Sequence, residues 1–183
     1  WTAEESGLLG SAFYAQNPIY PTAKTVANFT LDILQTAGLA RDVILVGEGQ
    51  SELESDLARA ALTQGRTVTP ESLPENGLFF RADHFSLAKA GVPVLLLMGI
   101  AGGADLVEGG RSAGDQWVTD YISGCYHQTC DAWDPAWDLS GAVQDVELFQ
   151  WIIEDLADSR RWPEWKEGSE FKAIRQQSSH QRQ

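Results

Sequence analysis

The sequence lacks any hydrophobic run long enough to cross a membrane as a helix. Such a helix needs about 20 consecutive apolar residues, whereas the longest apolar run, Val92 to Met98, has the length of a strand. Basic residues are also scarce, because 13 Lys and Arg stand against 26 Asp and Glu and leave a net charge of −13. A chain this acidic repels phosphate backbones and anionic lipids. We therefore expect no membrane span and no nucleic acid, and small molecules, cations or peptides as partners.

Cysteine is nearly absent as well. The two cysteines, Cys125 and Cys130, lie five positions apart. This spacing permits a small disulfide in an oxidising compartment and equally permits two free thiols. The sequence leaves both alternatives open.

The length of 183 residues and the 43% content of hydrophobic residues suit one domain with a sizeable core. We expect this domain to cover residues 1–158 and to be followed by a polar strap and frayed tail over 159–183, the fraying starting after Ile174. The chain opens at Trp1 without an initiator Met or a signal-like segment. We therefore expect it to be part of a longer protein.

Strands and helices alternate along the chain, which predicts an α/β fold with a mostly parallel sheet covered on both faces. Ser51 and Glu54 form a candidate capping box at the start of one helix. The expected strands are 26–34, 42–46 and 92–98, and the expected helices are 7–16, 51–62, 85–90 and 115–124. The Gly-rich segment 101–114 is expected to be a loop.

A long amphipathic helix is expected to close the domain. Its apolar positions recur at spacings of three and four, which is typical of a helix that turns one side to a core. These positions are Val143, Val146, Phe149, Ile153 and Leu156.

Three features offer groups that can do chemistry, although each has an ordinary structural explanation. Glu4 and Glu5 precede a helix, where they would also complement the helix dipole. Asp32 ends an apolar strand, at the edge where open α/β sheets place their sites, and would also serve as a turn cap. His127 is one of three histidines and, alone, would be a surface residue.

Taken together, the motifs follow a recognisable order. They are WTAEESGLLGS at 1–11, Leu31-Asp32, Ala82-Asp83-His84, Ala90-Gly91-Val92-Pro93, and Tyr126-His127 with Asp131 four residues on. This ordered set resembles the two-zinc aminopeptidases of metallopeptidase family M28, whose relatives include bacterial leucyl aminopeptidases, glutamate carboxypeptidase and glutaminyl cyclase. The resemblance covers residues 1 to about 135 and implies a zinc exopeptidase-like fold, a three-layer α/β/α sandwich around a mixed sheet.

The resemblance also implies roles for individual residues. Glu5 and His127 would bind one zinc ion and Asp32 the other, which suits the preference of zinc for imidazole nitrogen and carboxylate oxygen. Glu4 would be the general base that passes a proton from water to the leaving amine.

Four further residues are expected near the site. Asp131 would orient His127 or its loop, and Tyr126 would stand beside that histidine. Asp83 and His84 match a family motif that lines the pocket, or else they form a helix N-cap with a neighbouring histidine.

The chain also departs from the family pattern. The family takes one further histidine and a metal-bridging aspartate from a segment before the Glu-Glu motif, so we expect this chain to be the C-terminal half of the domain. Its partner would be the missing N-terminal half, two zinc ions would occupy only the complete site, and this chain alone would hold zinc partially at most. Where members commonly have Asn, this chain has Thr30, two residues before Asp32. A sheet edge left bare would favour a homodimer.

The resemblance favours an aminopeptidase that acts on peptide substrates and is secreted or periplasmic, with the 183 residues alone expected to be inactive. Two alternatives remain open. One is a glutaminyl cyclase, an acyl transferase on the same scaffold, against which the retained Glu4, Glu5 and Asp32 argue. The other is a non-catalytic binding or structural module.

Overall fold

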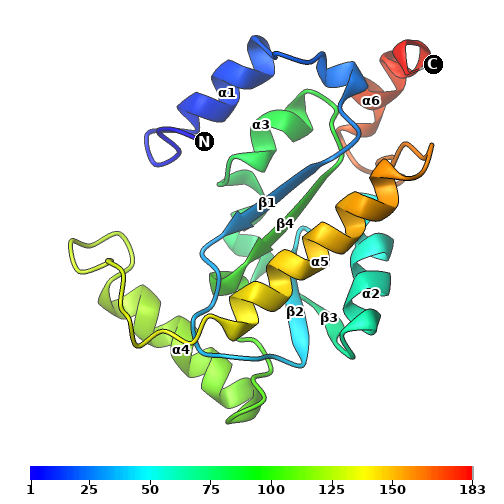
Figure 1. Cartoon of the computed structure of the whole chain (residues 1–183). Helices are drawn as coiled ribbons and strands as arrows, with labels where there is room; N and C mark the ends of the chain where they lie inside the picture. Colours follow the sequence, from blue (N-terminus) through cyan, green and yellow to red (C-terminus); the bar gives the residue numbers. More distant parts are fainter. Residues whose placement is uncertain (183) are drawn as a thin grey trace.

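The computed structural model describes residues 1–182 of the chain. A four-stranded sheet lies at its centre, in the order β1-β4-β2-β3 (Figure 1). The strands are β1 (Asn28–Asp32), β2 (Asp42–Val46), β3 (Thr67–Pro70) and β4 (Val94–Met98). β1 pairs with β4 and β2 with β3 in parallel, whereas β2 and β4 are antiparallel. The prediction of an α/β fold with a mostly parallel mixed sheet is confirmed.

Helices cover both faces of this sheet. The α-helices are α1 (Leu9–Gln16), α2 (Leu53–Thr63), α3 (His84–Lys89), α4 (Gly110–Gly124), α5 (Ser140–Ala157) and α6 (Lys172–Gln177). Short 3-10 helices are η1 (Thr22–Lys24), η2 (Pro74–Asn76), η3 (Leu78–Phe80), η4 (Gly99–Ala101) and η5 (Ser179–Gln181). None of the helices within residues 1–182 is long and apolar enough to cross a membrane.

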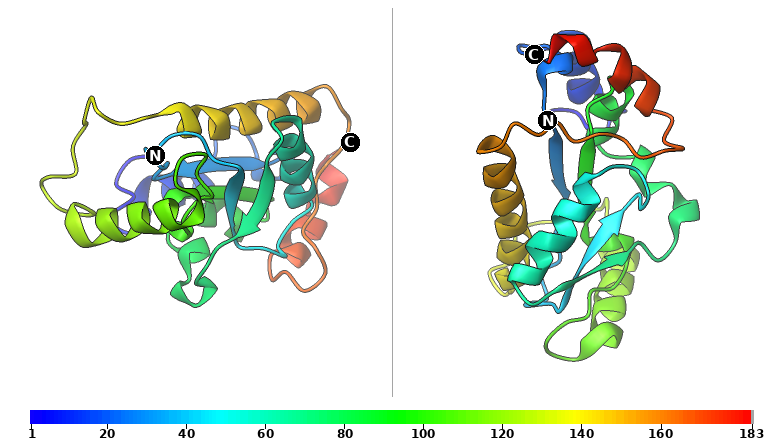
Figure 2. Two further views of the ribbon diagram at one scale, coloured as in Figure 1. Left: turned by 90° about the horizontal axis from the view of Figure 1, so that it is seen from below. Right: turned by 90° about the vertical axis from the view of Figure 1, so that its right-hand side faces the viewer.

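The core consists of two apolar layers, one on each face of the sheet. Successive side chains of a strand point to opposite faces, so Leu95 and Leu97 of β4 pack against α2 and α5 while Leu96 and Met98 face α3. Figure 2 shows α2 and α5 side by side on one face. Both central strands are buried along their full length, which explains why their sequences are apolar apart from Asp42 at the start of β2.

The buried face of α5 agrees only in part with the predicted one. Phe149 and Leu156 are buried as predicted, but Val143, Val146 and Ile153 are 53%, 46% and 47% exposed. Leu148 and Ile152 are buried in their place. The buried face also includes Asp145, whose carboxylate lies 2.7 Å from the Arg66 guanidinium. Because Asp145 is charged, the buried side of α5 is not continuously apolar in sequence. The spacing of apolar residues therefore predicted a face that overlaps only partly with the buried one.

Three other local predictions need correction. Helix α4 begins at Gly110, inside the segment expected to be a loop. Strand β3 was not expected, because it is short and only partly buried. The capping box is half formed: the Ser51 amide donates to Glu54, but the Ser51 hydroxyl contacts the carbonyl of Val94.

The segment after α5 is anchored to the domain. Trp165 and Phe171 are 1% and 3% exposed and belong to the core layer beneath α3. Arg175, also buried, donates hydrogen bonds to the carbonyls of Thr25 and Val26 at 2.9 and 3.1 Å. Where fraying was expected after Ile174, the structure has α6 and η5. Gln183, the last residue of the expected tail, lies outside the described residues.

Candidate functional site

Most of the residues singled out in the sequence line one cavity of about 510 Å³. Asp32 and Met98 end the parallel strands β1 and β4, and both line this cavity. Glu4 and Glu5 reach it from the loop before α1, and His127 from the loop after α4. Both loops lie on the left of Figure 1, the side towards which the arrowheads of β1 and β4 point. The cavity thus stands at the carboxyl ends of strands, where α/β sheets commonly bind ligands.

His127 and Glu5 form the closest contact described within this group. The His127 Nε2 atom lies 2.8 Å from Oε1 of Glu5. The Tyr126 ring stacks on the imidazole with a centroid separation of 3.8 Å. His127 has a φ of +58°, a conformation that costs energy for a non-glycine residue. The loop therefore holds the imidazole in a constrained position.

The carboxylates of the cavity disturb one another electrostatically. The pKa of Glu4 is raised, first by burial and then by the charges of Asp32 and Glu5. The pKa of Asp32 is also raised, first by burial and then by Glu5 and Asp83. Like charges held close together favour protonation, and a bound cation would favour the ionised forms instead.

The donor chemistry of the cavity fits zinc. Carboxylate oxygen and imidazole nitrogen are ligands that this ion accepts, and the negative potential around Glu4 and Asp32 would attract a cation. Within residues 1–182, no three His, Cys, Asp or Glu side chains are close enough together to hold a metal ion. The described residues therefore supply suitable ligand types without a gathered ligand set.

Asp83 and His84 are not among the residues that line the cavity. Asp83 is 6% exposed, and its Oδ1 atom has no hydrogen-bond partner among the described residues. It occupies the N-cap position of α3, but its side chain makes no capping hydrogen bond. His84 is fully buried with its ring 4.9 Å from that of Phe79, and burial lowers its pKa to about 4. Asp83 acts on the cavity through its charge, and His84 is a neutral core residue.

Thr30, the departure noted in the sequence, contacts its own strand. Its hydroxyl donates to the Asn28 side chain at 3.1 Å. No hydrogen bond from Thr30 to Asp32 is found in residues 1–182. With Thr at position 30, the side chain two residues before Asp32 therefore does not hold the Asp32 carboxylate in place.

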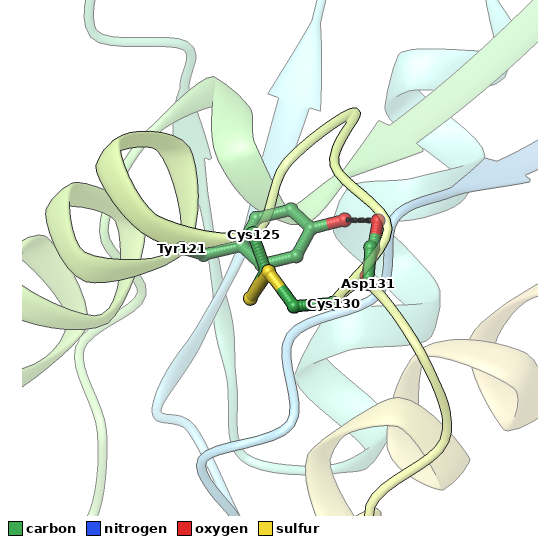
Figure 3. The surroundings of a disulfide bond; sticks show 4 residues. All are labelled: Tyr121, Cys125, Cys130 and Asp131. Atoms are coloured by element: carbon green, nitrogen blue, oxygen red, sulfur yellow. Dashed lines mark hydrogen bonds between the residues drawn. A yellow bond between two sulfur atoms is a disulfide. The ribbon is translucent and has the colours of Figure 1, made fainter.

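Cys125 and Cys130 are joined by a disulfide, which resolves the alternative left open by the sequence. The bridge closes the loop that carries His127 (Figure 3). Beside it, the hydroxyl of Tyr121 on α4 donates to the Asp131 carboxylate at 2.8 Å. Two links, one covalent and one polar, thus fasten the His127 loop to the end of α4. Asp131 lines the cavity, and no hydrogen bond joins it to His127 in residues 1–182.

Removal of this disulfide should lower stability measurably. For a closure of five positions, loop-closure entropy predicts a loss of about 2 kcal/mol in the free energy of unfolding. We expect urea denaturation of the Cys125→Ser/Cys130→Ser double variant to show that loss. Reductant should shift the wild-type curve by a similar amount and leave the variant unchanged. Equal midpoints for wild type and variant would contradict the prediction.

Several cavity residues belong to none of the motifs that the sequence offers as candidates. Tyr121 lies within α4 and pairs with Asp131 across the loop, a contact that no local spacing announces. Arg81 and Lys89 also line the cavity. A signal for Arg81 existed, because it stands two residues before Asp83 in the Asp-His motif.

A family of known proteins matches most of the chain. The sequence model described as Peptidase family M28 matches residues 1–149 of the chain, which includes every residue named at the cavity. Comparisons with curated proteins and with solved structures give no match.

Proposed function

The chain belongs to peptidase family M28, and from that premise we propose that it carries catalytic groups of a zinc-dependent aminopeptidase. Membership supports a hydrolase of peptide bonds in a family that is generally zinc-dependent. The observation that carries the finer proposal is the convergence of Glu4, Glu5, Asp32 and His127 on one cavity. These residues come from three separate segments of the sequence.

The proposal gives each residue one task. Glu5 and His127 hold one zinc ion, in keeping with their 2.8 Å contact, and Asp32 holds the second. Two zinc ions need more ligands than these three side chains, so the test of hydrolysis uses the natural full-length protein. Zinc bound there would polarise the scissile carbonyl and make water a better nucleophile near neutral pH.

Glu4 is the proposed general base. Its partly buried carboxylate lines the cavity beside Asp32 and Glu5. It accepts a proton from the attacking water as the C–O bond forms, and it then returns that proton to the nitrogen of the departing amine as the C–N bond breaks. The acidic surroundings also attract the positively charged amino terminus of a peptide, which favours an aminopeptidase.

The disulfide indicates the kind of compartment in which the protein acts. Disulfides persist in oxidising compartments and are rare in the reducing cytosol. The bridge between Cys125 and Cys130 therefore supports the proposal that the protein is secreted or periplasmic.

Product analysis tests the proposed reaction. The natural full-length protein, supplied with zinc, is incubated with a peptide that begins with glutamine, and the products are identified by mass spectrometry. We expect release of free glutamine and a peptide shortened by one residue. Loss of ammonia from an otherwise intact peptide would identify a cyclase, and an unchanged peptide in a panel of different N-termini would contradict the proposal.

A further inference from the structure

The lining of the cavity carries charges of both signs. Its acidic members are Glu4, Glu5, Asp32 and Asp131, and its basic members are Arg81 and Lys89. The lining also includes the apolar residues Leu78, Phe80, Phe85 and Met98. A ligand that carries both charges and an apolar part would match this composition.

Arg81 is the cation most available to a ligand. Its guanidinium makes no hydrogen bond, ion pair or ring contact with any of residues 1–182, and its side chain is exposed. Lys89, by contrast, has its Nζ atom 4.7 Å above the ring of Phe85. An arginine side chain presents a planar fork of donors that matches a carboxylate.

Arg81 shares its cavity with the proposed catalytic groups. Glu4, Glu5, Asp32 and His127 line the same space as the Arg81 side chain. A ligand held by the acidic residues therefore lies in the same cavity as the guanidinium.

Hydrogen bonding and burial fix the backbone position of Arg81. Its amide donates to the carbonyl of Leu78 at 3.0 Å, closing the 3-10 turn η3. Ala82 and Asp83, the next two residues, are buried. The exposed side chain of Arg81 therefore departs from an anchored stretch of backbone at the edge of the cavity.

We propose that Arg81 determines specificity by binding a carboxylate of the peptide substrate, an inference that rests on the proposed peptidase function. The acidic residues attract the amino terminus, and they would repel a carboxylate if no cation faced it. The carboxylate has two sources: the free C-terminus of a dipeptide or tripeptide, or an acidic side chain next to the scissile bond. A cavity of about 510 Å³ has the size of a small-ligand site.

Four substrates separate these sources in a kinetic test of the full-length enzyme. They are Leu-Ala, Leu-Ala-amide, Leu-Glu-amide and Leu-Gln-amide. We expect a KM about tenfold lower for Leu-Ala than for its amide, the scale of a charge-assisted hydrogen bond. A similar preference for Leu-Glu-amide over Leu-Gln-amide would show that acidic side chains use the same group.

Arg81→Gln should abolish these preferences mainly through KM, and Arg81→Lys should keep part of them, because lysine retains the charge without the fork. Arg160→Gln is the matched control, since Arg160 is also exposed and without a side-chain partner in residues 1–182 but does not line the cavity. It should behave as the wild type does.

A binding measurement keeps the inference separate from turnover. The probe is a Leu-Ala analogue in which a methyleneamine replaces the scissile amide, so it cannot be hydrolysed. It is prepared with a free C-terminal carboxylate (the acid) and with an amidated C-terminus (the amide), and calorimetry measures the affinity of each. We expect the acid to bind about tenfold more tightly than the amide to the wild type, and equally to Arg81→Gln. If the enzyme hydrolyses peptides and Arg81→Gln still prefers the acid to the amide, the carboxylate site is refuted and the peptidase proposal stands. If binding of the acid depends on Arg81 but no peptide is hydrolysed, the carboxylate site stands and the peptidase proposal is refuted.

Discussion

Replacement of Glu4 by Gln is expected to lower peptide hydrolysis by about 10²–10⁴-fold, the usual contribution of a general base. Glutamine has nearly the shape of glutamate but cannot accept the proton of the attacking water. The side chain lines the cavity beside Asp32 and Glu5, so the change should act on the proton transfer and leave zinc bound. The fall should appear in kcat, measured with Leu-Ala.

A matched control tests whether the loss of one negative charge alone lowers activity. Glu75→Gln makes the same exchange at an exposed position in η2 that does not line the cavity, and it should hydrolyse peptides at the wild-type rate. Normal turnover by Glu4→Gln with zinc in place would refute the assignment of the base. Loss of zinc together with turnover would instead make Glu4 a metal ligand.

The second large effect is expected at His127. Removal of its imidazole takes away a proposed zinc ligand that contacts Glu5. Loss of a residue that only orients a metal ligand typically lowers activity by roughly 10–100-fold. Hydrolysis by the His127 variant should fall by more than that. Asn is the informative replacement, because it tolerates a positive φ such as the +58° found here, so His127→Asn removes the ligand without adding backbone strain.

His180 supplies the control for the His127 variant. It lies in η5, is exposed, and is absent from the cavity lining, so His180→Asn should keep full activity. Thermal unfolding of both variants without zinc should match that of the wild type. Full activity in His127→Asn would exclude this histidine as a ligand.

Much of the fold was predictable because its central strands are simple in sequence. The run Asp42–Val46 is apolar after its first residue and rich in β-branched residues, and it forms β2 with the predicted bounds. The face of α5 was not predictable from periodicity, because Asp145 belongs to the buried side through its contact with Arg66, a residue far away in sequence. A pattern of single residues cannot reveal that pairing.

The candidate site shows the same division. Ordered motifs identified Glu4, Glu5, Asp32 and His127, and the structure places all four at one cavity. Spacing could not reveal the disulfide, because two thiols five positions apart have the same sequence whether joined or free. The spacing to the Asp-His motif marks the position of Arg81, but its significance comes from the charges that share its cavity.

Zinc content after dialysis is the most direct measurement of the central claim, that these residues form part of a zinc site. The natural full-length protein and its His127→Asn variant are loaded with zinc, dialysed and analysed for metal per chain. The proposed ligand roles predict two zinc ions in the wild type and loss of at least one in the variant, with hydrolysis lost on chelation and restored by zinc. Equal zinc in both proteins, or full hydrolysis by metal-free protein, would contradict the claim.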